Sequence, residues 1–231
     1  MLFETRPCVQ PLKAITLENG NTLEYVTNVK LLGFQVDENL NWKQHIDMTC
    51  KNISKGIYAL KQLRPYVSEE NVKQSYYAYV HSVMSYGIIL WGSSTDSERI
   101  LKMQKRAIRV LVKAGYRDSC REYFKKLQIL TSVSVYILEM IMYVRKNITE
   151  FRYNNCARYN NNRIQIAQHR LNITKQLPRI MGAKLFNKLP KCIINLESDN
   201  AFRHNVQKLL LDKTLYSIRE YLDNDYKYYI L

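Results

Sequence analysis

The stretch from Ser68 to Gly115 constrains the fold more than any other part of the sequence. Its apolar side chains recur every three or four residues, which predicts helix, and a polar break after Gly92 divides the pattern in two. Ser68 followed by two glutamates suits the free N–H groups of a first helical turn. Thr95 and Glu98 form a capping box for the second helix, and we expect Gly92 and Gly115 to end the two helices.

The second helix combines an apolar stripe with a face that carries only positive charges. The stripe is formed by Ile100, Met103, Ala107, Val110 and Ala114. The cations are Lys102, Arg106, Arg109 and Lys113, with Lys105 beside them. They are displaced from the stripe by about two positions, and at roughly 100° per residue this places them almost opposite the core. The face is therefore either an ordinary solvated surface or a contact surface for an anionic partner.

The distribution of charge along the chain favours the anionic partner. The net charge is +15 over 231 residues. Residues 1–93 contribute nine Lys and Arg against eight Asp and Glu, whereas residues 94–150 contribute twelve against six. Residues 151–231 contribute fourteen against six, and the first part of this region, 151–196, has no carboxylate at all. Such asymmetry is typical of proteins that bind RNA or DNA or another anionic surface.

The cysteines indicate a reducing compartment, and the hydrophobic segments indicate neither secretion nor a membrane span. The five cysteines are widely scattered and form no C-x-x-C pair, so neither a zinc module nor a disulfide framework is predicted. The N-terminus lacks the pattern of a signal peptide. The apolar helix expected over Val133–Val144 is shorter than the roughly twenty residues that cross a bilayer. We expect a nuclear or cytoplasmic protein that is not secreted and has no membrane partner.

The N-terminal residues alternate as strands do, and the rest of the chain is helical. The expected strands are Met1–Phe3, a hairpin over residues 15–26 that turns at Asn19-Gly20, and Val29–Val36 with an interruption at Gly33. From Trp42 onward the apolar spacing becomes helical, and Ser198 is expected to cap the last long helix. The predicted fold class is mainly α with a small N-terminal antiparallel β meander.

A second basic region, Phe151–Leu177, is rich in asparagine and interleaves aromatic and cationic side chains. Its arginines are Arg152, Arg158, Arg163 and Arg170. The segment is either a flexible linker or an arm whose cations neutralise phosphates while its rings accept stacked bases, and both descriptions can hold for one segment.

The sequence contains no self-sufficient active site. Nucleotidyl transfer needs clustered carboxylates that hold two metal ions, and no such cluster is present. Asp37 and Glu38 are expected in a turn, and Asp223 and Asp225 near the C-terminus are not adjacent. We therefore predict no catalytic, metal-binding or cofactor-binding residue in this chain.

Three motifs occur in an order found in one known family. They are Leu31-Leu-Gly-Phe-Gln-Val-Asp37, Tyr86-Gly-Ile-Ile-Leu-Trp-Gly92 and Leu101-Lys-Met-Gln-Lys-Arg-Ala-Ile-Arg109, supported by Phe186-Asn-Lys-Leu-Pro190. In this order they resemble the C-terminal part of the reverse transcriptase of a jockey-like non-LTR (LINE) retrotransposon, a transposable element. Each motif is weak alone, but the combined pattern is specific and covers nearly the whole chain.

The resemblance implies a division of the chain and a role for each part. Residues 1–40 would be the remnant of a palm sheet with a primer-grip-like hairpin at Lys30, Leu32 and Gly33. Residues 41–150 would be a helical, thumb-like bundle, and residues 151–231 the basic segment and C-terminal helices. The family's Ala-Asp-Asp motif, which uses Mg²⁺, would precede Met1. This chain alone is therefore predicted to be inactive as an RNA-directed DNA polymerase.

Three functional hypotheses follow. The first is a reverse transcriptase fragment that binds the backbone of RNA, DNA or their hybrid without sequence preference, through the helix cations and the four arginines of the basic region. The second is a structural or interaction module, or a relic without a selected function. The third is an accessory subunit that associates with a longer polymerase chain.

Overall fold

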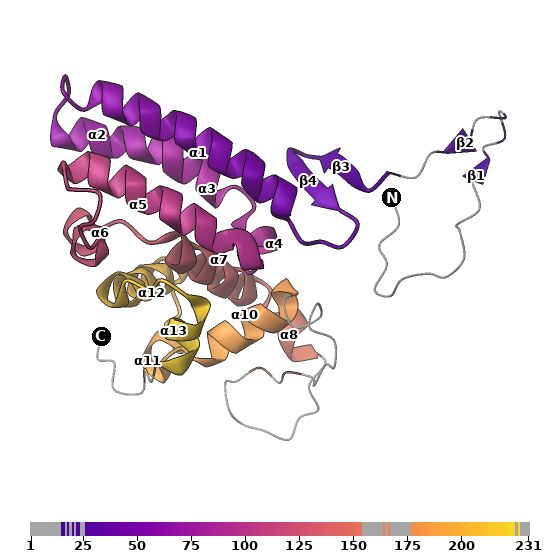
Figure 1. The fold of residues 1–231 in the computed structure, drawn as a ribbon. Helices are drawn as coiled ribbons and strands as arrows, with labels where there is room; N and C mark the ends of the chain where they lie inside the picture. Colours follow the sequence, from indigo (N-terminus) through magenta and orange to yellow (C-terminus); the bar gives the residue numbers. More distant parts are fainter. Residues whose placement is uncertain are drawn as a thin grey trace.

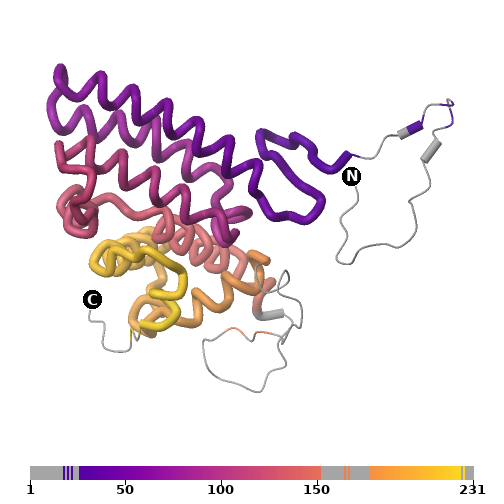
Figure 2. The backbone as a smooth tube through the Cα atoms, in the orientation of Figure 1, coloured from indigo at the N-terminus to yellow at the C-terminus, as the bar shows by residue number. Residues whose placement is uncertain are grey.

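The computed structural model describes residues 15–16, 18, 20, 22–23, 26–153, 164, 166, 177–224 and 226. Most of these residues are helical, and the small amount of strand lies near the N-terminus, so the predicted fold class is confirmed at this level (Figure 1). The tube in Figure 2 shows an upper group of helices from the first half of the chain and a lower group from the C-terminal part, with one helix passing between them.

The strands form two separate two-stranded sheets rather than one meander. The strand β1 (Ile15–Thr16) pairs antiparallel with β2 (Thr22–Leu23), as expected for a hairpin around Asn19-Gly20. The strand predicted over Val29–Val36 is instead a second hairpin. It consists of β3 (Asn28–Leu31) and β4 (Phe34–Asp37), in register Asn28 to Asp37 and Leu31 to Phe34. Leu32 and Gly33 both have positive φ, as a two-residue turn of this type requires, so the chain reverses at the predicted interruption. The strand predicted over Met1–Phe3 lies outside the described residues.

An aromatic cluster attaches the β3–β4 hairpin to the helices. The ring of Phe34 stacks on that of Tyr86 with 4.9 Å between centroids, and the Tyr86 hydroxyl donates to the Leu32 carbonyl at 2.6 Å. His45 lies in the same cluster, with its ring centroid 5.3 Å from Phe34 and 5.8 Å from Trp91. The hairpin is thereby held at the N-terminal end of α1 (Lys43–Leu63) (Figure 1).

His45 makes the stability of this cluster sensitive to acid. It is only 3% exposed, and burial lowers its pKa from the ordinary 6.5. Below pH 6.5 the unfolded chain therefore binds a proton that the folded chain does not, so the unfolding free energy falls as the pH drops toward the folded pKa. We expect a loss of up to about 1.4 kcal/mol per pH unit from this one residue. Urea unfolding at pH 7.5 and 5.5 measures it, because His45→Gln should reduce the difference and the exposed His204→Gln should not.

The upper group of helices comes from the first half of the chain. After α1 the chain returns through a nearly continuous helix made of α2 (Glu69–Tyr76), the π-helical turn η1 (Tyr77–His81) and α3 (Ser82–Ser85). The short helix α4 (Ile88–Trp91) and the 3₁₀ turn η2 (Thr95–Ser97) then lead into α5 (Glu98–Val112). Gly56 of α1 packs against the backbone of η1, where an added Cβ would lie 2.6 Å from the Tyr79 carbonyl oxygen.

The predicted helix ends are partly right. The hydroxyl of Ser68 accepts a hydrogen bond from the N–H of Asn71, which confirms the cap of the first helix. The capping box at Thr95 is wrong, because Thr95 begins the 3₁₀ turn and α5 starts without a side-chain cap. Gly115 does not end α5 either. Lys113 takes the left-handed conformation, with φ of 56°, and its N–H bonds back to the helix, so the helix stops two residues earlier.

The helix α7 (Ser132–Lys146) occupies the centre of the molecule, as its apolar sequence indicates. It is capped by Thr131, whose hydroxyl accepts from the N–H of Ser134, and it contacts both groups of helices (Figure 1). Gly182 allows α10 (Pro178–Asn187) to approach α7 closely, since an added Cβ would lie 2.8 Å from a methyl group of Val144. The remaining helices are α6 (Arg121–Leu127), α8 (Ile148–Tyr153), α11 (Lys191–Ile194), α12 (Asp199–Lys213) and α13 (Ile218–Asp223).

One described residue of the basic segment is fixed to the core. Ile164 is buried, its N–H donates to the side-chain oxygen of Asn187 at 2.8 Å, and its carbonyl accepts from the Asn187 amide at 2.7 Å. The segment therefore docks on α10 at this point, which neither a free linker nor a free arm predicts.

Candidate nucleic-acid interface

The basic face of α5 lies opposite its buried face. The buried residues of this helix are Ile100, Leu101, Gln104, Ala107, Ile108 and Leu111. The cations predicted to face outward, Lys102, Arg106, Arg109 and Lys113, are exposed or half-buried. At about 100° per residue the centre of the buried set and the centre of the cations are on nearly opposite sides of the helix. The predicted orientation of the cations is thus confirmed.

The predicted apolar stripe of α5 is wrong in part, because the buried face is rotated about the helix axis from Met103 and Val110 toward Leu101, Gln104 and Ile108. Met103 and Val110 are half-buried rather than central, and Ala114 lies beyond the end of the helix. Packing against both α1 and α7 turns the helix so that Gln104 points inward. The displaced residues Met103 and Val110 therefore contribute apolar surface next to the cations.

A groove of about 580 Å³ runs between α1 and the basic face of α5. The two helices are parallel, since Arg99 pairs with Asp47 near their first turns and the Arg64 guanidinium donates to the Leu111 carbonyl near their last. The groove is lined by Ser54, Ile57 and Lys61 from α1 and by Met103, Arg106, Arg109, Val110, Lys113, Ala114 and Tyr116 from α5 and the loop after it. Its lining combines apolar side chains with four cations.

Arg109 organises one end of this groove. Its guanidinium donates twice to the carbonyl oxygen of Asp118, at 2.9 and 3.2 Å, while the Asp118 carboxylate accepts from the N–H of Gly115 at 2.8 Å. The loop after α5 is therefore folded back against the helix. It presents the Tyr116 ring, which is 78% exposed, at 5.9 Å from the Arg109 guanidinium carbon.

Lys61 is the cation of the groove that sequence reasoning missed. It is exposed in the last turn of α1, forty-one residues before Lys102 in the chain. The helical period of α1 predicts that Lys61 lies on the flank next to the buried Ile57, but no local pattern predicts that α5 packs along that flank.

Lys105 does not belong to the groove, although it was included among the binding cations. Its ammonium nitrogen lies 3.5 Å from the centroid of the ring of Tyr216, a residue between α12 and α13. The Arg121 guanidinium carbon lies 4.3 Å from the same ring. Burial lowers the pKa of Lys105 and raises that of Tyr216 to about 12. Lys105 thus serves to pack α5 against the C-terminal region, which is a cation–π role.

The structure gives no side-chain positions for the other predicted arginines. Arg158, Arg163 and Arg170 lie outside the described residues, and for Arg152 only the backbone in α8 is described. The primer-grip-like residues Lys30, Leu32 and Gly33 belong to the β3–β4 hairpin at the opposite end of α1 from Lys61. Since α1 rises about 1.5 Å per residue, that end is on the order of 27 Å away.

The described residues include no group of three or more His, Cys, Asp or Glu side chains able to hold a metal ion. Asp37 is occupied in a turn, as expected: its carboxylate accepts from the N–H groups of Asn39, Asn41 and Trp42. Within the same part of the chain, no single helix combines the length and apolar composition of a membrane span. The bent pair of α6 and α7 meets both criteria when its helices are taken together.

The fold and the groove define a helical protein with a basic interhelical surface. Comparisons with protein-family models, with curated proteins and with solved structures find no significant match to this chain. Its function must therefore be argued from the groove itself and from the motifs in the sequence.

Proposed function

We propose that this protein binds the backbone of nucleic acid in the groove between α1 and α5. The observation that carries the proposal is the convergence of Lys61, Arg106, Arg109 and Lys113 on one groove. Three of the four belong to the stretch between Arg99 and Arg117, which contains no carboxylate. Lysine and arginine contacts to phosphates supply most of the affinity of sequence-independent nucleic-acid binding.

The rigidity of the two helices supports this role. Arg106 and Arg109 lie one turn apart on α5, Lys113 is its C-terminal cap one turn further on, and Lys61 faces them from a parallel helix. Cations fixed in this way lose less conformational freedom on binding than cations on a loop. The binding is expected to be tolerant of sequence, because backbone contacts carry no base information.

The resemblance to a retrotransposon reverse transcriptase gives this binding a context, and we propose it on the order of the three motifs alone. In this proposal the helices of residues 41–150 correspond to the thumb-like bundle, and the β3–β4 hairpin to the end of the palm with its primer grip. The chain is then a polymerase fragment that holds nucleic acid, or an accessory subunit of a longer polymerase chain.

The apolar floor of the groove favours a second candidate, a protein-interaction module. Ile57, Met103 and Val110 would suit the apolar side of an acidic amphipathic helix, with the surrounding cations pairing with its carboxylates. Competition between bound RNA and added poly-glutamate separates the two candidates. RNA that stays bound in a large excess of poly-glutamate would favour nucleic acid as the ligand. RNA that is displaced at an equal concentration of charge would favour an acidic protein.

Salt titration tests the proposed function directly. We expect the association constant for a short RNA or DNA duplex to fall linearly with salt on a log–log plot, with a slope of about −3 to −4 for four phosphate contacts. Fluorescence anisotropy between 50 and 200 mM salt measures the slope. A slope near zero, with binding retained, would contradict a backbone contact. Equal slopes for unrelated sequences are expected from the same model.

We expect no DNA synthesis by the purified chain on a primed RNA template with Mg²⁺. The reason is chemical, because the chain has no adjacent pair of aspartates to hold the two metal ions. Incorporation of labelled nucleotide is the measurement, with a known reverse transcriptase as positive control. Template-dependent incorporation that co-purifies with the folded chain would contradict the prediction.

A further inference from the structure

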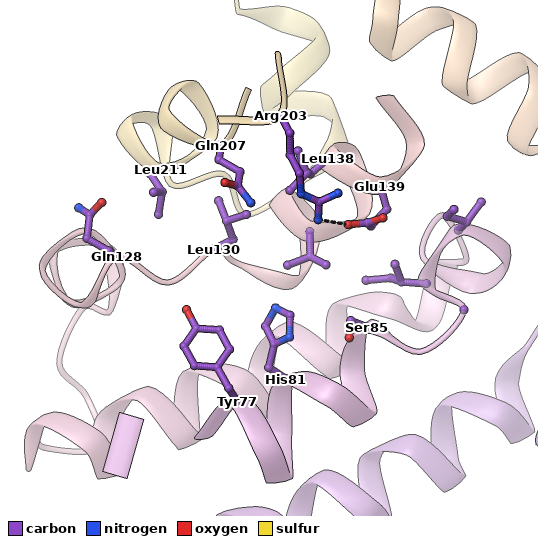
Figure 3. Close-up of a pocket in the computed structure, with 14 residues that line it drawn as sticks. Tyr77, His81, Ser85, Gln128, Leu130, Leu138, Glu139, Arg203, Gln207 and Leu211 are labelled. Atoms are coloured by element: carbon purple, nitrogen blue, oxygen red, sulfur yellow. Dashed lines mark hydrogen bonds and ion pairs between the residues drawn. The ribbon is translucent and has the colours of Figure 1, made fainter. Parts of the chain in front are cut away.

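A second cavity, of about 690 Å³, lies on the other side of the α2–η1–α3 helix from α1. Its walls come from that helix, from the start of α4, from the residues between α6 and α7, from α7 and from α12 (Figure 3). Its volume lies within the range of small-molecule sites in proteins. None of the α1–α5 groove residues line it, so it is independent of the proposed interface.

The π-helical turn η1 places two aromatic rings on one wall of this cavity. Tyr77 and His81 both line it, with ring centroids 5.1 Å apart and a 51° angle between their planes. Their neighbour Tyr76 points the other way, into the core, where it is fully buried. A π turn inserts an extra residue into a helix and is frequent at functional sites. Here the turn separates a core tyrosine from a cavity tyrosine that remains 39% exposed.

The facing wall carries groups suited to hydrogen bonding with a polar ring. The carboxamide of Gln207 reaches from α12 toward the cavity, and Gln128 lies near its end (Figure 3). Arg203 of α12 and Glu139 of α7 form an ion pair at 2.7 Å in the same wall. Burial lowers the pKa of His81, against the opposing charge of Glu139, so its imidazole is neutral at pH 7. A neutral imidazole both donates and accepts a hydrogen bond.

A basic groove of about 600 Å³ adjoins this cavity and shares Gln128, Gln207 and Leu211 with it. The groove lies between α6 and α12 and is also lined by Lys125, His204, Lys208 and Asp212. A ligand that extends from the cavity into the groove would therefore contact the rings of Tyr77 and His81 at one end and the two lysines at the other. The ammonium groups of lysine are common ligands of phosphate.

We infer that the cavity and the adjoining groove together form a site for one nucleotide. The base lies against Tyr77 and His81 with its polar edge toward Gln207, and the phosphate lies between Lys125 and Lys208. Stacking on aromatic rings tolerates any base, and a glutamine side chain is a common hydrogen-bonding partner of base edges. The nucleotide is either free or the terminal nucleotide of a strand, because both present the same base and phosphate.

The site is tested by titrating the folded chain with AMP and with inorganic phosphate, followed by NMR or calorimetry. We expect saturable binding of AMP that is at least about fivefold tighter than that of phosphate, since stacking adds to the charge contact. Tyr77→Ala and Lys208→Gln should each weaken AMP binding by about fivefold or more. The matched controls are Tyr79→Ala, an exposed tyrosine of the same turn outside the cavity, and Lys126→Gln, an exposed lysine outside the groove.

The measured affinities test the base site and identify the source of the nucleotide. Equal affinity for AMP and phosphate, or equal losses from Tyr77→Ala and Tyr79→Ala, would overturn the base site. A 5′-phosphorylated trinucleotide that binds more tightly than AMP, and loses this advantage in Tyr77→Ala, identifies the strand end as the source. Equal affinity for the two identifies the free nucleotide. Charge reversal in the α1–α5 groove should leave AMP binding unchanged, so failure of either site does not imply failure of the other.

Discussion

Replacing Lys61, Lys102 and Arg106 together by glutamate is expected to weaken binding to duplex or hybrid nucleic acid by more than about tenfold at moderate salt. Lys61 and Arg106 line the α1–α5 groove, and Lys102 lies one turn before Arg106 on the same face. Each reversal removes one cation from the phosphate backbone and adds a repulsive charge. The slope of log K against log salt should therefore flatten by roughly one unit for each of these cations that binds a phosphate in the parent protein.

These three residues can be replaced without disturbing the fold. All three side chains are exposed, and none of the three residues has positive φ. Arg109 is left intact because its guanidinium holds the loop after α5 through the Asp118 carbonyl. Lys113 is left intact because it ends α5 in the left-handed conformation. Thermal unfolding should shift little, since exposed charges contribute about 1 kcal/mol or less each.

A matched variant controls for net charge. Lys146, Lys191 and Arg219 are exposed residues of α7, α11 and α13, outside the groove, and their reversal to glutamate changes the net charge by the same amount. This variant should lose much less affinity than the groove variant. Unchanged affinity in a folded groove variant would refute the groove and leave the arginines of the 151–177 segment as the remaining candidates.

Gln104→Leu is expected to be among the most destabilising single substitutions in the chain. The Gln104 side chain is fully buried, and its amide nitrogen donates to the Tyr76 hydroxyl and to the Leu130 carbonyl, each at 2.8 Å. Its carbonyl oxygen accepts from the N–H of Ser132 at 2.7 Å. One side chain thus joins α2, α5 and the start of α7. Leucine leaves three buried polar groups unpaired, so we expect a loss of about 3 kcal/mol or more of unfolding free energy.

A double-mutant cycle separates the hydrogen bonds from packing. Tyr76→Phe removes the hydroxyl without a cavity and should cost about 1 kcal/mol, since Gln104 keeps its bonds to Leu130 and Ser132. The double variant should be less destabilised than the sum of the two single ones, because no hydroxyl is then left unpaired. Urea unfolding measures all four proteins. A Gln104→Leu protein as stable as the parent would show that these groups find other partners.

The sequence by itself determined the helices, their approximate ends and the charge on α5. Ser68 and Ser198 as caps, and an outer face of α5 with a run of cations that no carboxylate interrupts, are local features, and each appears in the structure as expected. Short-range chemistry is sufficient for them, because caps and helix faces depend on residues within one or two turns.

The phase of α5, the groove and the cavity were decided by tertiary packing. Gln104 interrupts the buried set of Leu101, Ile108 and Leu111, so the local pattern favours the more regular apolar stripe through Met103 and Val110. A buried glutamine is stable only where distant partners satisfy it, and Tyr76, Leu130 and Ser132 are brought to it by folding. Tertiary packing also brings Lys61 of α1 next to the cations of α5. It places Gln207 of α12 across the cavity from His81 of η1. The residues of each pair belong to separate helices and meet only in the folded chain.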